Sequence, residues 1–320
     1  SLAMIDEASQ LLEVQLLPLL CANETEGRRP IERFVLIGDH KQLPAIAQQD
    51  AQTAWVEEPE LRAAGLTDCR YSFFERFYRA YRNDPSVTYF LTCQARMHPE
   101  IAEFVNKHFY EGRLTARGLP HQLQALPDGG LDTATSRVVQ PHPAALREAI
   151  AHHRFFFVDY TPTATGLEAP YQNAQEAAII AEVVRGYVDY YAAQGKPLRP
   201  GEDIGVILPY RRQIAQVREA LRRAALPEVE EMTIDTVERY QGSERKIIIY
   251  GFTVLAVHQL NFLTSSMMEE NGALIDRKLN VVMTRAREHL VMVGHAALLR
   301  QVPLFAELLD YLLGVCVLAP

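Results

Sequence analysis

Short apolar runs that alternate with longer helical patterns constrain the fold of this chain more than any other feature. The segments 173–191 and 211–225 have helical periodicity, and the runs around them have the length and composition of buried strands. Six runs of this kind occur in the later part of the sequence, at 87–92, 155–159, 203–208, 231–235, 246–251 and 289–293. Strands that alternate with helices favour a parallel α/β sheet, and six runs predict one complete sheet.

The first part of the chain follows the same pattern with fewer elements. Apolar runs at 2–5 and 34–37 flank a helical stretch that carries Leu11, Leu12, Leu16 and Leu20. Because only two strands can be assigned here, we expect a truncated first domain at 1–85 and a complete second domain at 86–320. Segments 113–143 and 256–273 break the pattern and are predicted to be surface insertions.

Composition limits the classes of protein to which the chain can belong. Its 320 residues are enough for two domains, and the net charge of -8 argues against a general nucleic-acid coat protein while allowing a narrow basic track. The four cysteines are scattered singly, which predicts neither a zinc site nor a disulfide framework. No run is long enough to cross a bilayer and no signal peptide is recognisable, so we expect a cytoplasmic location.

Acidic residues directly follow the first strand. The pair Asp6-Glu7 is typical of a Walker B strand, in which the aspartate holds Mg²⁺ and the glutamate orients or deprotonates water. An ordinary acidic pair at a helix N-terminus is the alternative. A compact polar loop, Gly38 to Pro44, follows the next strand and could couple a γ-phosphate to movement of the sheet. Together the two loops favour the nucleotide-site interpretation.

Arginines lie beside predicted strands at two places in the second domain, one after a strand and two before another. Arg96 stands between an apolar run and a helix, and Arg285 and Arg287 stand before the run 289–294. An arginine held at the mouth of a strand can stabilise the charge that develops when a phosphate is cleaved. The alternatives are a surface salt bridge for Arg96 and, for 279–287, an amphipathic helix with Leu279, Val282 and Met283 inward and the arginines in solvent.

Other polar segments have weaker signals. The segment 233–244 contains one glycine and could expose backbone amides to phosphate, with a plain strand-turn-strand connection as the alternative. Five arginines on one helix, Arg211, Arg212, Arg218, Arg222 and Arg223, are predicted to form a solvated face. His98 has no nucleophile or carboxylate partner nearby, so we interpret it as a packing or hydrogen-bonding residue.

In this order the segments resemble the motifs of the superfamily 1 helicases, in particular the up-frameshift-like branch that includes the nonsense-mediated-decay RNA helicase and related DNA helicases. The segment 6–10 looks like motif II, 38–44 like motif III, and 96–99 like the arginine motif that opens the second RecA-like domain. Further along, 206–210 looks like the next strand motif, 236–244 like motif V and 279–287 like motif VI.

The resemblance implies a P-loop NTPase fold with tandem RecA-like parallel sheets, ATP and Mg²⁺ as cofactors, and single-stranded DNA or RNA as the partner. It implies that Asp6 coordinates Mg²⁺, Glu7 activates water and Gln42 senses the γ-phosphate. In the second domain it implies that Arg96 and Arg285 reach that phosphate, that Gly242 and Glu244 line the nucleotide, and that Thr236 touches the nucleic-acid backbone. Arg287 is expected to anchor the segment.

Three departures from the family pattern refine these expectations. No Gly-x-x-x-x-Gly-Lys-Ser/Thr sequence is present, so we expect the phosphate-binding loop to lie upstream and this chain to be inactive by itself. Ala95 stands where relatives often have a tyrosine that packs on adenine. Leu208 replaces a threonine that bonds the nucleic-acid backbone, so that contact is either absent or supplied by Tyr210.

The leading prediction is therefore part of an ATP-dependent helicase or translocase. The alternative is a non-catalytic RecA-like module that binds nucleic acid or protein without turnover. A nuclease has little support, because no compact metal constellation stands apart from Asp6-Glu7.

Overall fold

The computed structural model describes residues 1–22, 31–126, 136–163 and 171–315. Contacts divide the chain into two compact units, Ser1–Leu91 (unit 1) and Thr92–Pro320 (unit 2). The sequence placed the boundary after residue 85, and the structure places it after Leu91. The two units are described separately below.

Unit 1 contains a pair of parallel strands and several short helices. Strand β1 (Leu2–Ile5) pairs with β2 (Arg33–Leu36), as the two apolar runs predict. The aromatic face of helix α4 packs on β2, where Phe34 lies 5.9 Å from Phe73 and 6.1 Å from Phe77 between ring centroids. The helices of this unit are η1 (Ala8–Gln10), α1 (Glu13–Leu20), α2 (Ala51–Ala54), α3 (Pro59–Ala63) and α4 (Phe73–Tyr81).

Unit 2 is built on a six-stranded parallel sheet, with strand order β5-β6-β12-β9-β7-β8. This architecture, with helices in the crossovers, is that of a RecA-like domain of a P-loop NTPase. In the centre, Leu290 of β12 aligns with Phe155 of β6 and with Ile248 of β9. The strands are β5 (Val138–Val139), β6 (Phe155–Asp159), β7 (Ile204–Leu208), β8 (Thr233–Thr236), β9 (Arg245–Gly251) and β12 (Ala286–Gly294).

One predicted strand is wrong, and one strand of the six-stranded sheet was missed. Residues 87–92 do not form a strand, and the alternate side chains Val87, Tyr89 and Leu91 are 66%, 85% and 70% exposed. Their apolar alternation imitates a strand, but no neighbouring strand covers them in the part of the chain that is described. The sixth strand is instead β5, which lies in the predicted insertion 113–143 and is too short to show periodicity.

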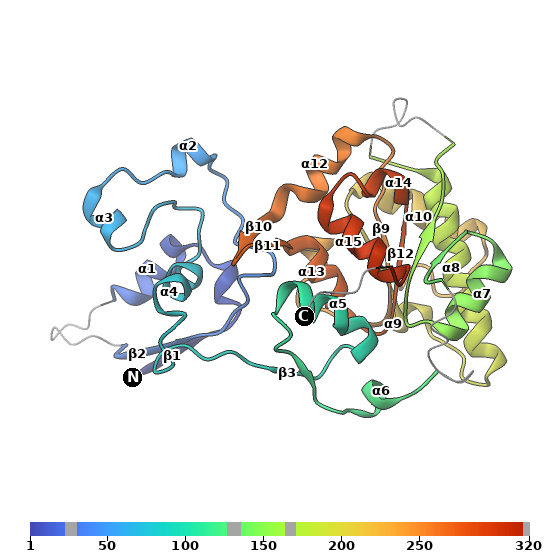
Figure 1. The fold of residues 1–320 in the computed structure, drawn as a ribbon, viewed down its shortest axis with the longest axis horizontal. Helices are drawn as coiled ribbons and strands as arrows, with labels where there is room; N and C mark the ends of the chain where they lie inside the picture. The colour runs from blue at the N-terminus through green and yellow to red at the C-terminus, as the bar shows by residue number, and fades with distance from the viewer. Residues whose placement is uncertain (23–30, 127–135, 164–170, 316–320) are drawn as a thin grey trace. The chain divides into compact units, whose positions relative to one another are not determined.

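Helices cover both faces of the sheet, because successive side chains of a strand point to opposite sides. On one face, α7 (Pro143–His152), α8 (Ala174–Ala193) and α10 (Arg211–Arg223) pack on alternate strand residues such as Phe156 and Val291. On the other face, Phe252 lies 6.1 Å from Phe157 of β6 and 5.4 Å from Phe305 of α15 (Pro303–Leu312). Figure 1 shows α15 and α8 on either side of the strands. The predictions of helices over 173–191 and 211–225 are confirmed.

The remaining elements lie before, between and after these strands. The predicted insertion 256–273 contains short helices and a strand, and β10 pairs antiparallel with β11. These elements are β3 (Cys93–Gln94), α5 (Pro99–Phe109), β4 (Thr115–Ala116), α6 (Pro120–Leu123), α9 (Pro200–Asp203), α11 (Val237–Tyr240), η2 (Val257–Gln259), α12 (Leu260–Leu263), η3 (Thr264–Ser266), β10 (Met267–Glu270), β11 (Ala273–Asp276), α13 (Arg277–Met283) and α14 (Ala296–Leu299). No helix in the described ranges has both the length and the apolar character needed to span a membrane.

Candidate nucleotide-hydrolysis site

The acidic pair of unit 1 lies at the carboxyl end of β1, in a sharply turned backbone. Glu7 adopts the left-handed conformation, with φ 51° and ψ 35°, and its backbone N–H donates to Asp6 Oδ1 at 2.9 Å. A non-glycine residue in this conformation costs about 1–2 kcal/mol, and such strain is concentrated at functional positions. The next backbone N–H, of Ala8, donates to Ile37 O at 2.7 Å and so ties this turn to the end of β2.

Gly38 allows the loop after β2 to lie against the turn after β1. A Cβ atom at Gly38 would lie 2.8 Å from the backbone nitrogen of Ser9, so only glycine fits without a shift. The Asp39 N–H then donates to Ser9 Oγ at 3.2 Å, and Gln42 Nε2 donates to Asp39 Oδ2 at 3.1 Å. The polar residues of motifs II and III therefore meet at one edge of the strand pair.

The carboxylates of Asp6 and Glu7 are exposed, and they are held only by local bonds. Gln10 Nε2 donates to Glu7 Oε2 at 2.7 Å. Mg²⁺ in phosphate-transfer sites is bound through one or two carboxylates, substrate phosphates and water, which a single exposed aspartate can satisfy. In the described residues no group of three or more His, Cys, Asp or Glu side chains could hold a metal by itself. The donor set thus fits Mg²⁺ delivered with a nucleotide.

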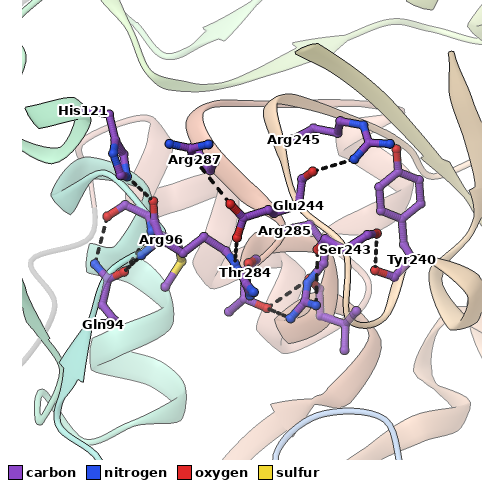
Figure 2. A network of polar contacts seen from close by, with 12 residues as sticks. Gln94, Arg96, His121, Tyr240, Ser243, Glu244, Arg245, Thr284, Arg285 and Arg287 are labelled. Carbon is purple, nitrogen blue, oxygen red and sulfur yellow. Dashed lines mark hydrogen bonds and ion pairs between the residues drawn. The ribbon is translucent and has the colours of Figure 1, made fainter. Parts of the chain in front are cut away.

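In unit 2, Arg96 is anchored to a turn that lies far away in sequence. Its Nε donates to Glu244 Oε2 at 2.7 Å, and Nη1 donates to the Thr284 carbonyl at 3.1 Å. The Arg96 side chain is still 34% exposed. The surface salt bridge considered for Arg96 does form, but a second bond to a backbone carbonyl fixes the guanidinium as part of a larger network (Figure 2).

Arg285 lies directly before β12 and is only 3% exposed. Its Nε donates to Val281 O at 3.1 Å, and Nη2 donates to Thr284 Oγ1 at 3.1 Å. Nη1 is 3.5 Å from the Ser243 carbonyl, at the limit of a hydrogen bond. Arg285 therefore supports the turn that carries Ser243 and Glu244. In Figure 2 its side chain lies below Glu244.

Arg287 reaches Glu244 from the same side as Arg96. Its Nε lies 3.7 Å from Glu244 Oε1, and both side chains are 41% exposed. Burial raises the pKa of Glu244, but the hydrogen bond from Arg96 and the charges of Arg96 and Arg287 outweigh it and lower the pKa. Glu244 is consequently an anion that holds two arginines in place.

The segment before β12 is not the amphipathic helix that was considered for it. Helix α13 is buried along all seven residues, and the Asp276 carboxylate caps it by accepting from Lys278 N at 2.9 Å and Leu279 N at 3.2 Å. Leu279 points inward as that interpretation required, but Arg285 is buried rather than solvated. Because α13 is buried on every side, it can hold Arg285, which follows it, in one position.

The connection from β8 to β9 contains two further residues that were predicted to belong to the site, Thr236 and Gly242. It contains the helical turn α11, so the plain strand-turn-strand alternative is wrong. Thr236 lies at its start and is half-buried, at the carboxyl end of β8. Gly242 near its end has φ 79°, a left-handed conformation that glycine adopts without strain. Seven residues thus lie between Thr236 and Glu244.

Tyr210 lies at the carboxyl end of β7 and is packed between two aromatic rings. Its ring centroid is 4.9 Å from those of Tyr171 and Phe262, and the residue is only 8% exposed. Burial raises its pKa to about 12, so the phenol is neutral and can only donate or accept a hydrogen bond. The exposed members of this aromatic cluster are Tyr171 and Phe262, at 48% and 42%.

His98 is a packing and hydrogen-bonding residue, as predicted. It is 7% exposed, its Nδ1 accepts from Glu100 N at 3.3 Å, and its backbone N–H donates to Arg287 O at 2.8 Å. Burial and the charge of Arg154 lower its pKa to about 4. The solvated face predicted for α10 is confirmed for Arg211, Arg212, Arg222 and Arg223, which are exposed, whereas Arg218 is half-buried.

Sequence reasoning missed several residues that position Arg96. Gln94 Oε1 accepts from the Arg96 and Met97 backbone N–H groups at 2.9 and 2.8 Å, and His121 Nε2 lies 2.8 Å from the Arg96 carbonyl. The Thr284 carbonyl accepts a hydrogen bond from Arg96, and the Ser243 carbonyl faces Arg285. A Gln two residues before an Arg is the only local signal, because the other contacts join segments far apart in sequence.

Comparison with known proteins assigns the chain to a family. AAA-domain models match residues 1–50 and 69–297, and the second match covers more than half of the chain. The chain is 29% identical over 320 residues to the mouse DNA replication ATP-dependent helicase/nuclease DNA2, covering 97% of this chain and 26% of that protein. It is 30% identical over 314 residues to the human 3'-5' exoribonuclease HELZ2, covering 96% of this chain and 9% of that protein.

An uncharacterised ATP-dependent helicase of Methanocaldococcus jannaschii is 27% identical over 313 residues, with 96% of this chain and 38% of that protein covered. This chain therefore spans between about a tenth and two fifths of the length of these relatives. The chain belongs to the AAA-domain family of superfamily 1 helicases, in its up-frameshift-like branch.

Proposed function

We propose that the full protein hydrolyses ATP to move along single-stranded DNA or RNA. The observation that carries this proposal is the network in which Arg96 and Arg285 are fixed around the Ser243–Glu244 turn by bonds to several separate segments. Folding alone does not require two arginines on the Glu244 carboxylate and a third against the Ser243 carbonyl, at the amino ends of two central strands. Pre-positioned guanidinium groups are what phosphoryl transfer requires.

The residues of unit 1 serve the attack of water on the γ-phosphorus. Glu7 orients the water and accepts its proton as the new P–O bond forms and the bond to the β-phosphate oxygen breaks. Gln42, anchored to Asp39 at 3.1 Å, senses the γ-phosphate. Asp6 would hold Mg²⁺, which neutralises charge on the phosphate oxygens.

The arginines of unit 2 stabilise the charge on the transferred phosphoryl group. Arg96, about one-third exposed, has N–H groups that can turn from Glu244 to phosphate. Arg285 acts after its longest bond, 3.5 Å to the Ser243 carbonyl, is exchanged for a phosphate oxygen. Gly242 and Glu244 lie on the same turn as Ser243, so contact with the nucleotide there moves the carboxylate that holds Arg96 and the carbonyl that accepts from Arg285.

Nucleic-acid contact is proposed at the opposite end of the unit 2 sheet. Thr236 ends β8, while Glu244 directly precedes β9, so the α11 connection runs from one end of the parallel sheet to the other. A movement of the Ser243–Glu244 turn can therefore be transmitted to Thr236 along the short segment 237–243 that connects them. Tyr210, which is mostly buried, supports the aromatic cluster beside this end and does not itself stack on a base.

The test is hydrolysis and strand displacement by the full-length protein. We expect ATP turnover that rises when single-stranded DNA or RNA is added, and displacement of a duplex strand that requires a single-stranded overhang. Separate DNA and RNA substrates, each with either a 5′ or a 3′ overhang, identify the substrate and the direction. We also propose that a phosphate-binding loop outside this sequence is required, so residues 1–320 alone should not turn over ATP.

The matched control is Asp6→Asn, which removes the proposed Mg²⁺ ligand while keeping the shape of the turn. Strand binding without any ATP turnover by the full-length protein would favour a non-catalytic RecA-like binding module instead. Robust turnover by residues 1–320 alone would contradict the requirement for an additional phosphate-binding loop.

A further inference from the structure

A polar pocket of about 130 Å³ lies in unit 2 at the amino ends of β6, β9 and β12. Arg154 directly precedes β6, Lys246 is the second residue of β9, and Glu288 and His289 lie in the first half of β12. The end of α8 and the turn after it supply the other wall, which includes Tyr191 and Lys196. None of these residues has a role in the proposed ATPase activity.

Arg154 is the most unusual residue of this pocket, because its guanidinium is buried without a neutralising partner. The residue is 2% exposed, and Nη1 donates to the Glu288 carbonyl at 3.2 Å while Nη2 donates to the Gln124 carbonyl. Its Nε has no hydrogen-bond partner, and Arg154 forms no ion pair with a carboxylate of the described residues. A buried charge is normally paired, because removing it from water costs several kcal/mol.

Two lysines add further positive charge to the lining. Lys246 Nζ lies 4.1 Å from the centroid of the Tyr191 ring, and Lys196 is exposed at the pocket rim. Neither lysine forms an ion pair with a described residue. Glu288 is the one acidic residue of the lining, so the formal charge of the lining is positive by two.

The pKa shift of His289 is consistent with an excess of positive charge in the pocket. His289 is 1% exposed, and burial together with the charges of Arg154 and Lys246 lowers its pKa to about 3. His289 is consequently neutral, and it can accept or donate a hydrogen bond without adding to the positive charge. Outside the lining, burial raises the pKa of Glu100 while the charge of Arg154 opposes this rise, so Glu100 compensates Arg154 only at longer range.

We infer that this pocket binds one phosphate group through Arg154, Lys246 and Lys196. The volume exceeds the roughly 30 Å³ that one water occupies in the liquid, but falls below the 300 Å³ or more of typical pockets for drug-sized ligands, so a single oxyanion fits and a whole nucleotide does not. A guanidinium with one unsatisfied N–H, flanked by two ammonium groups, is a donor set suited to phosphate oxygens. The inference does not depend on the proposed ATPase activity.

The phosphate can come from two sources, free inorganic phosphate or the backbone of a nucleic-acid strand. The test titrates each into the protein by calorimetry, using inorganic phosphate and a short single-stranded oligonucleotide, with no ATP present. We compare wild type with Lys246→Gln and Lys196→Gln, which remove one ammonium group each. Lys107→Gln is the control, because Lys107 lies on α5 and pairs with Glu103 outside the pocket.

We expect the affinity for inorganic phosphate to fall about tenfold in each pocket variant and to stay unchanged in Lys107→Gln. If the strand is the source, oligonucleotide binding falls in the same two variants and inorganic phosphate competes with it. Equal binding by all four proteins, or no binding of either probe, would overturn the inference. Because Lys196 is exposed and Lys246 is half-buried, both substitutions are expected to leave the fold intact, so a loss of binding reports on the pocket.

Discussion

The polar turn of unit 1 and the arginine network of unit 2 are both built at strand ends, but they are held in different ways. In unit 1, Asp6 and Glu7 are exposed and are fixed by the backbone conformation and by bonds to close neighbours. In unit 2, Arg285 is 3% exposed and is fixed by oxygens from α13 and from the turn before β9. The first site is local and open, and the second is assembled from distant segments.

The packing beneath the two sites differs in the same way. The strand pair of unit 1 leaves Met4 and Val35 66% and 42% exposed, while the central strand residues of unit 2, such as Val291, are fully buried. A sheet covered on both faces can position charged side chains at its edge with little freedom. We therefore expect unit 2 to tolerate substitution of its functional residues less well than unit 1.

The largest expected effect comes from Arg285→Ala in the full-length protein. If Arg285 stabilises the phosphoryl group, kcat for ATP should fall about 10³-fold, with a much smaller change in ATP affinity. Arg287→Ala is the matched control, because Arg287 lies two residues away, pairs with Glu244 next to the Ser243 carbonyl that Arg285 contacts, and is 41% exposed. We expect it to reduce kcat less than tenfold. Steady-state hydrolysis and nucleotide-binding titrations measure both values.

The same pair of variants can reverse the assignment. A large kcat loss in Arg287→Ala with near-normal turnover in Arg285→Ala would make the exposed arginine the catalytic one and the buried arginine a brace. A thermal melt of each variant separates catalysis from folding, since removal of the Arg285 bonds to Val281 and Thr284 also removes buried contacts.

Glu176, a fully buried carboxylate at the start of α8, allows a test of how well the core of unit 2 excludes water. It accepts hydrogen bonds from Tyr160 at 3.0 Å and from Thr253 N and Oγ1 at 2.9 and 2.7 Å, yet burial raises its pKa to about 7. The folded state therefore keeps this proton where the unfolded chain, with a pKa near 4.5, has lost it. The stability it contributes is fully present below about pH 4.5 and is lost as pH rises through about 7.

Denaturant unfolding of wild type and Glu176→Gln at several pH values measures this effect. Between pH 4.5 and 7 the free energy of unfolding of wild type should decrease by about 3 kcal/mol relative to Glu176→Gln, which cannot titrate. Glu182→Gln on the same helix is the control, because the Glu182 side chain is 49% exposed. A constant difference between wild type and Glu176→Gln over this range would mean that water reaches Glu176 and that the unit is less sealed than its packing indicates.

The contrast between the two sites also explains what the sequence could predict. The unit 1 site follows from adjacency, because acidic and polar residues directly after two apolar runs must meet when the strands are parallel. Four strands of the unit 2 sheet, β6, β7, β9 and β12, were recognisable because each is a mostly buried apolar run, whereas β8 has only Ile234 buried. The two-residue β5 has no such signal, and the exposed alternation of Val87, Tyr89 and Leu91 copies the pattern of a strand without its pairing.

The geometry of the arginines could not be read from the sequence. Arg96 and Glu244 are 148 residues apart, so nothing local to either residue reports their 2.7 Å contact. The resemblance to helicases named both residues but assigned them separate roles at the nucleotide. Whether an arginine before a strand is solvated or buried depends on what covers the preceding helix, and α13 is covered on all sides.

The smallest expected effect comes from Gly38→Ala, which tests the local site of unit 1. The new methyl group would lie 2.8 Å from the backbone nitrogen of Ser9, so the loops after β1 and β2 must separate. We expect a loss of about 2 kcal/mol in the stability of unit 1 and a moderate fall in ATP turnover, because Gln42 is displaced relative to Glu7. Ile46→Ala nearby in the chain is the control, since Ile46 is 81% exposed. Unchanged turnover and stability in Gly38→Ala would mean that the two loops need no close contact, and that the exposed site of unit 1 is organised by something other than the turn geometry.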